Sequence, residues 1–109
     1  MTDDVLQRLV AVIRSRRDES AAKSYTRELL EAGPERCARK LGEEATETVI
    51  AALGSDNTAL AREAADLVYH LLVLLESKHT PWSDVLKELE QRMGTSGLAE
   101  KAGRKSPSP

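Results

Sequence analysis

The sequence feature that most restricts the fold is a pair of long helical patterns separated by a short break. Apolar side chains recur at helical spacing over residues 35–53 and again over residues 58–78. Between them stands Gly54-Ser55-Asp56-Asn57, which combines a residue that ends helices with residues that cap them. Short connections join antiparallel neighbours, so we predict a helical hairpin that folds back about Ser55.

Two acidic stripes lie at matching distances from this turn. Glu47 and Glu63 are each eight residues from Ser55. Glu44 and Asp66 are each eleven residues from it. Residues three apart are neighbours on a helix surface, so each helix carries its two acids on one face. A closed hairpin would bring four carboxylates into one groove, and their mutual repulsion calls for a cation there.

The ligand types indicate which cation. Sites built only from carboxylate oxygens suit Mg²⁺ or Mn²⁺, with water completing an octahedron. Mg²⁺ held by few carboxylates commonly takes substrate phosphates as further ligands, and Lys40, one turn before Glu44, is placed to neutralise phosphate charge. The pattern favours metal-assisted attack of water on a phosphoanhydride. The predicted ligands are Glu44, Glu47, Glu63 and Asp66.

Other chemistries lack their defining residues. The chain has no Gly-rich phosphate loop of the P-loop type, which argues against a kinase or motor ATPase. A di-iron four-helix bundle takes Glu-x-x-His from two helices, but here Asp66 stands where that histidine would be. His70 lies one turn further on, and a substrate contact and a structural hydrogen bond are both open for it.

The composition agrees with an all-helical domain. Aromatic residues make up 3% of the 109 residues and Phe is absent, so the core must come from Leu, Val, Ile and Ala. We predict an all-α antiparallel bundle of about five helices over residues 1–94, followed by a flexible tail at 95–109. The stretch Leu67–Leu75 is apolar almost all round, which predicts a homodimer or larger homo-oligomer through the central hairpin.

The shorter helices have their own start and stop residues. Helical patterns over residues 2–17 and 27–31 precede Gly33, a typical helix-ending residue, and Thr80-Pro81 is typical of the start of a last helix. Ser24 or Thr26 is expected to cap the second helix, although hydroxyls at a helix N-terminus can also hold a phosphate. Gly42, inside a long helix, indicates close packing or a kink.

Charge and hydropathy restrict the partners and the location. The net charge of −2 gives no basic footprint for nucleic acid. The longest apolar run, Leu71–Leu75, is far short of the roughly 20 residues of a membrane span, so no membrane partner is expected. No secretory signal is evident at the N-terminus, and Cys37 is alone, as expected of a small buried residue in a reducing compartment. We therefore expect a cytoplasmic protein.

These residues resemble a known family. The pair Glu44-x-x-Glu47 and Glu63-x-x-Asp66, with fifteen residues between them, resembles the metal signature of the all-α, MazG-like nucleotide pyrophosphohydrolases. Within that superfamily, three stretches look like the phosphoribosyl-ATP pyrophosphatase family: Ser24-Tyr25-Thr26, residues 40–47 and residues 63–75. The resemblance runs from about residue 6 to residue 92. Some family members are fused to a cyclohydrolase domain, and this chain looks like the form without it.

The resemblance implies the second step of histidine biosynthesis. In that step phosphoribosyl-ATP is hydrolysed between its α and β phosphates, giving phosphoribosyl-AMP and pyrophosphate, by Mg²⁺-dependent helical dimers or larger assemblies. It further implies catalytic roles for Glu43, as an additional ligand or a base, and for Glu47. The first implied substrate contact is Lys40. The further implied contacts are Ser24, Tyr25, Thr26 and His70.

Two alternatives remain open on the sequence. The first is a house-cleaning hydrolase for noncanonical nucleoside triphosphates, which would prefer dUTP or dCTP to phosphoribosyl-ATP. The second is a dimeric, non-enzymatic helical interaction module whose acidic groove binds a basic partner. That module predicts a melting curve unchanged by Mg²⁺ and nucleotide, so the two alternatives and the pyrophosphatase are separable by experiment.

Overall fold

The computed structural model describes residues 4–18 and 24–93, and within these ranges the chain forms helices without strands. The predicted all-α fold of about five helices is confirmed. The expected tail at 95–109, and with it the boundary of the predicted domain, lies outside the described residues. In chain order the helices are α1 (Val5–Arg16), α2 (Tyr25–Ala32), α3 (Pro34–Ala52), α4 (Asn57–Ser77) and α5 (Trp82–Met93).

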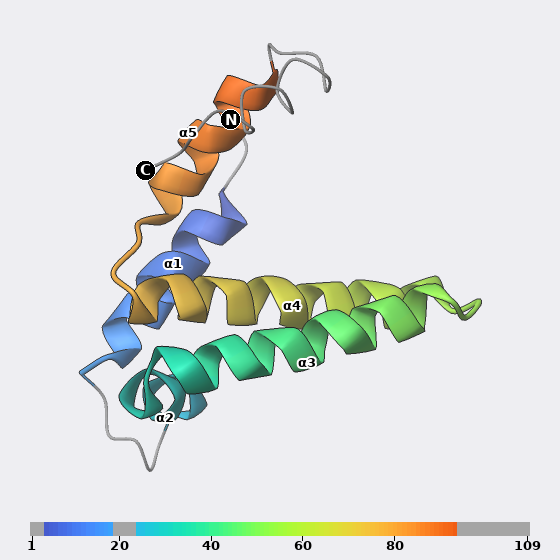
Figure 1. Cartoon of the computed structure of the whole chain (residues 1–109), viewed down its shortest axis with the longest axis horizontal. Helices are drawn as coiled ribbons and strands as arrows, with labels where there is room; N and C mark the ends of the chain where they lie inside the picture. The colour runs from blue at the N-terminus through green and yellow to red at the C-terminus, as the bar shows by residue number, and fades with distance from the viewer. Residues whose placement is uncertain (1–3, 19–23, 94–109) are drawn as a thin grey trace, which may run out of the picture.

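The two longest helices, α3 and α4, form the predicted antiparallel hairpin, and their connecting turn projects away from the other helices (Figure 1). Asp56 caps α4, because its carboxylate accepts hydrogen bonds from the backbone N–H groups of Thr58 and Ala59 at 2.9 and 3.2 Å. A residue of the turn therefore caps the second long helix, as the sequence indicated.

The short helices begin and end within a few residues of the predicted positions. Ser24, not Thr26, is the N-cap of α2, which begins two residues earlier than predicted. Gly33 has a φ of 99°, a conformation that side chains with a Cβ rarely adopt, and Pro34 opens α3. Pro81, expected in the first turn of α5, lies directly before that helix.

The hydrophobic core sits at one end of the hairpin. There α1 packs on the C-terminal half of α4, and α2 packs beside the start of α3 (Figure 1). Cys37 is buried in this core as predicted, and burial raises the pKa of its thiol. Trp82 is half-buried against the same cluster, in the packing role expected of it. The buried members are Ile13, Leu29, Cys37, Leu72 and Val73.

Gly42 does not mark a close approach. It is exposed on α3, and a Cβ built there meets no atom within 4 Å. The prediction of close packing at this glycine is wrong, because helix propensity cannot distinguish an exposed position from a packed one.

Several parts of the described structure leave apolar side chains exposed. Near the tip of the hairpin, Val49, Ile50 and Leu53 are exposed, Leu53 by 83%. Helix α5 runs away from the hairpin and buries none of its residues fully (Figure 1). Among the described residues, no helix is both long and apolar enough to cross a membrane.

Candidate metal centre and substrate site

Carboxylates from both long helices meet midway along the hairpin. Glu44 comes from α3, and Glu63 and Asp66 come from α4. One oxygen of each lies within 4.8 Å of the others, close enough to surround a single cation. The two acidic stripes therefore face each other. Glu47 lies outside this mutual set but borders it, since its carboxylate acts on Glu44.

Glu44 is half-buried, with most of its side chain covered. Its side chain is 12% exposed, and within the described structure its Oε2 atom has no hydrogen-bond partner. Burial raises the pKa of the Glu44 carboxyl, and Glu47 raises it further by hydrogen-bonding the protonated form and repelling the ionised one. A carboxylate oxygen without a partner, next to other carboxylates, is what a hard divalent cation would satisfy.

His70 stands beside Glu44 with both ring nitrogens engaged. Its Nδ1 lies 2.8 Å from the backbone carbonyl of Asp66, and because a carbonyl only accepts, Nδ1 carries the proton. In the neutral imidazole Nε2 is then the acceptor, and the hydroxyl of Tyr25, 3.2 Å away, donates to it. The same Nδ1 is 3.9 Å from Oε1 of Glu44. This network orients the imidazole next to the carboxylates.

The three residues that begin α2 serve different purposes. Ser24 accepts a hydrogen bond from the backbone N–H of Arg27 at 3.1 Å, so its hydroxyl caps the helix. Thr26 shares a short hydrogen bond with the hydroxyl of Tyr69, a residue for which the sequence suggested no role. The ring of Tyr25 stacks on that of Tyr69 with centroids 6.4 Å apart. These contacts hold α2 against α4 next to His70.

Lys40 and Glu43 form an ion pair one turn from the carboxylates. Lys40 Nζ lies 3.0 Å from Glu43 Oε1, and this hydrogen bond raises the pKa of the lysine. Glu43 is exposed and does not belong to the group that meets around Glu44. Lys40 is half-buried and Glu43 is exposed, so this ion pair lies at the surface beside the carboxylates.

Thr48 is a second residue that the sequence did not bring to attention. Its hydroxyl lies 2.8 Å from the backbone carbonyl of Glu44 and 3.1 Å from that of Glu63. It thus bridges the two helices at the residues whose carboxylates meet. The sequence pattern that could have revealed it is a hydroxyl one turn after Glu44, at a position facing the partner helix.

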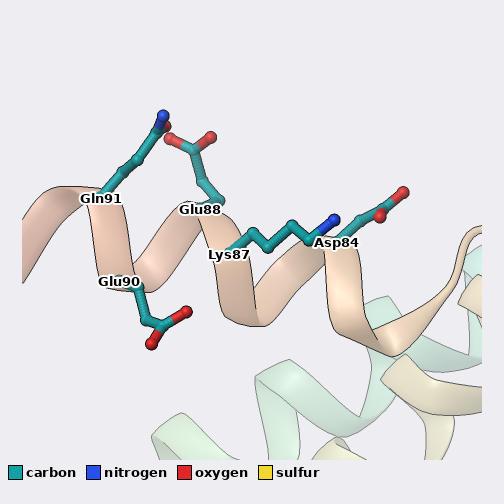
Figure 2. A pocket seen from close by; sticks show the side chains of 5 residues that line it. All are labelled: Asp84, Lys87, Glu88, Glu90 and Gln91. Carbon is teal, nitrogen blue, oxygen red and sulfur yellow. The ribbon is translucent and has the colours of Figure 1, made fainter.

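A surface hollow of about 580 Å³ lies elsewhere, and all the residues lining it belong to α5. Figure 2 shows Glu90 pointing away from the side chains on the opposite side of this helix. A single exposed helix cannot enclose a ligand, and the candidate site rests instead on the carboxylates that meet between α3 and α4. The lining residues are Asp84, Lys87, Glu88, Glu90 and Gln91.

Comparison with known proteins agrees with this geometry. Residues 6–93 match the family model of phosphoribosyl-ATP pyrophosphohydrolase. The chain belongs to this family. The matched range contains Glu44, Glu63 and Asp66, so the family match and the carboxylate cluster concern the same part of the phosphoribosyl-ATP pyrophosphohydrolase fold.

Curated relatives cover nearly the whole chain. A protein of Cereibacter sphaeroides named phosphoribosyl-ATP pyrophosphatase is 51% identical over 92% of this chain and 97% of its own length. Proteins of the same name from a Jannaschia species and from Agrobacterium fabrum are each 52% identical, over 91% and 94% of this chain and 97% and 95% of their own lengths. The similarity therefore extends across the whole phosphoribosyl-ATP pyrophosphohydrolase domain.

Proposed function

We propose that this chain hydrolyses phosphoribosyl-ATP between its α and β phosphates, the second step of histidine biosynthesis. Water adds across the P–O–P bridge and yields phosphoribosyl-AMP and pyrophosphate. The observation that supports this best is the meeting of Glu44, Glu63 and Asp66 within 4.8 Å, in a chain of the phosphoribosyl-ATP pyrophosphohydrolase family. Such an acidic groove can accept a polyphosphate only with cations between the two.

The proposed cofactor is Mg²⁺, with Mn²⁺ as a substitute. The all-oxygen donor set and the unpartnered Oε2 of Glu44 fit a hard divalent cation. When bound, such an ion polarises the phosphoryl group and neutralises charge on the leaving pyrophosphate. The residues proposed to hold it are Glu44, Glu47, Glu63 and Asp66.

The proposed base is Glu43 or Glu47. Each is exposed, so each can reach water in the groove. A base must lie within hydrogen-bond reach of the proton it removes and must be ionised beforehand. Glu43 is paired with Lys40, whereas the carboxylate of Glu47 acts directly on Glu44. We propose that one of these two carboxylates takes the proton from the attacking water.

The proposed substrate contacts surround the carboxylates. The ammonium group of Lys40 would leave its ion pair with Glu43 and pair with a phosphate oxygen instead. This is a short movement for a flexible side chain. Tyr25 is 46% exposed and His70 is held behind it, which suits a ribose or phosphate contact from the phenol with the imidazole as its support. Ser24 and Thr26 complete the proposed set at the start of α2.

We further propose a homodimer or larger homo-oligomer that covers the hairpin. The exposed Val49, Ile50 and Leu53 make an apolar surface next to the site, of the kind that protein interfaces bury. The site then lies close to a second subunit. For the location we propose the cytoplasm, in accord with the free thiol of Cys37.

The test is product identification with phosphoribosyl-ATP and Mg²⁺, followed by phosphorus NMR. The proposal expects pyrophosphate and phosphoribosyl-AMP in equal amounts, and no turnover when the divalent ion is removed by a chelator. Release of inorganic phosphate would contradict the bond assignment. Preference for dUTP or dCTP in the same assay would indicate the house-cleaning activity instead. Absence of any hydrolysis, with no stabilisation by Mg²⁺ and nucleotide, would indicate a non-enzymatic module.

A further inference from the structure

The hydroxyl of Thr48 is placed between the backbones of two residues that carry site carboxylates. Thr48 is half-buried on α3, 2.8 Å from the carbonyl oxygen of Glu44 on its own helix. It is also 3.1 Å from the carbonyl oxygen of Glu63 on α4. A hydroxyl has one proton to donate, so the two carbonyls share it. One side chain thus links the two helices at the level of the carboxylates.

Electrostatic repulsion between the carboxylates opposes the contact that Thr48 makes between α3 and α4. Glu44, Glu63 and Asp66 repel one another when no cation lies among them, and this repulsion pushes α3 and α4 apart. The buried core lies nearer the other end of the hairpin, where α1 and α2 pack. A hydrogen bond between the two helices at the site opposes this repulsion, and a hydroxyl that donates to a helical carbonyl provides one without using a carboxylate.

We propose that Thr48 is a positioning residue that fixes the separation of Glu44 and Glu63 before the cation arrives. This inference rests on the proposed metal site, and it adds a residue that touches neither the cation nor the substrate. Groups that orient metal ligands without binding the metal commonly change metal affinity by large factors when they are removed. Loss of the hydroxyl should therefore weaken cation binding by more than it weakens the fold.

The experiment measures the affinity for Mn²⁺ alone, by calorimetry, without substrate. Thr48→Val removes the hydroxyl and keeps the shape of the side chain. We expect its Mn²⁺ dissociation constant to rise about tenfold. Thr48→Ser keeps the hydroxyl and should stay within about twofold of the wild type. Thr48→Ala differs from Thr48→Ser by one oxygen atom, so this pair gives the same comparison if the valine variant does not fold.

Two controls separate positioning from general destabilisation. Thr46 makes the same hydrogen bond within α3, to the carbonyl of Gly42 at 3.1 Å, but it is exposed and does not reach α4. Thr46→Val should leave Mn²⁺ affinity unchanged. Ile13 is buried in the core on α1, and Ile13→Val should lower the melting temperature without changing the affinity.

The outcomes are distinct. Weaker Mn²⁺ binding in Thr48→Val and Thr48→Ala, with the serine variant and both controls near wild type, supports the proposal. Equal affinity in all Thr48 variants overturns it and leaves the proposed metal site standing. Equal loss of affinity in Ile13→Val overturns it as well, since stability alone would then explain the effect. If the wild type itself binds no Mn²⁺, the inference is overturned, and the assay of pyrophosphate release from phosphoribosyl-ATP with Mg²⁺ tests the proposed function separately.

Discussion

At the scale of single residues, Glu44 is the site carboxylate whose ionised form is disfavoured in the folded state. Burial and the neighbouring Glu47 raise the pKa of its carboxyl in the folded state. The stabilisation linked to this shift is present at low pH and is lost as the pH rises through the raised pKa. Without metal, the ionised Glu44 therefore destabilises the fold at neutral pH. A bound cation would reverse this effect by neutralising the charge.

Glu44→Gln should consequently melt at a higher temperature than the wild type in a chelator at pH 7, because it removes the buried charge. The gain should shrink as the pH falls through the raised pKa, where the wild-type carboxyl becomes protonated. Circular dichroism melts between about pH 4.5 and pH 8 measure this difference. A gain that does not change with pH, or a loss of stability at pH 7, would contradict the account of Glu44.

Gly42 gives an independent test of the helix itself. Since a Cβ there meets nothing, Gly42→Ala should stabilise the protein by about 0.5–1 kcal/mol through helix propensity alone. In a domain of this size each 1 kcal/mol raises the melting temperature by roughly 4–8 °C. The matched control is Gly33→Ala, which should destabilise because of the positive φ at Gly33. A Gly42→Ala variant less stable than the wild type would contradict the exposed placement.

At the scale of secondary-structure elements, α1 is attached to the end of α4 by an ion pair. Arg17 Nη2 donates to the Oε2 and the backbone carbonyl of Glu76 at 2.8 and 2.7 Å, and Arg14 Nε lies 3.4 Å from Oε1. Glu76 is only 12% exposed, so an unpaired charge there would be costly. In addition, Arg27 donates to the carbonyl of Arg17, which ties α2 to the same junction.

Arg17→Met should therefore cost about 1–3 kcal/mol, measured by denaturant unfolding, because Glu76 loses a partner that lies in a half-buried place. The control is Arg39→Met. Arg39 pairs with Glu35 on the exposed surface of α3, where the effect should stay below about 0.5 kcal/mol. Equal effects of the two variants would show that the junction with α4 is not a special attachment.

Local chemistry explains how much the sequence could predict. The hairpin, its turn and the facing of the acidic stripes follow from helical period and capping residues, as Asp56 and Gly33 illustrate. The bond from Arg17 to Glu76 joins residues 59 positions apart, and no period in the sequence encodes it. The pairing of Thr26 with Tyr69 and the bridge from Thr48 to Glu63 depend on side-chain direction across two helices. These needed the structure.

At the scale of the whole molecule, the exposed hairpin tip predicts association. Ile50 is 62% exposed beside Val49 and Leu53, and we expect a second copy to cover this surface. Ile50→Glu should shift the protein to a monomer in sedimentation velocity, because an interface core excludes charge. Val12→Glu, at an exposed apolar position on α1, is the control and should keep the wild-type size. An unchanged size for Ile50→Glu would place the interface elsewhere.

The central claim is that carboxylates from two helices act together on one phosphoanhydride. The most direct measurement is pyrophosphate release from phosphoribosyl-ATP by Asp66→Asn and Glu63→Gln, with circular dichroism to verify the fold. We predict that each folded variant loses about a hundredfold or more in rate, since each substitution removes a charged oxygen ligand. Full activity in either folded variant would contradict the metal site, even though the chain belongs to the phosphoribosyl-ATP pyrophosphohydrolase family.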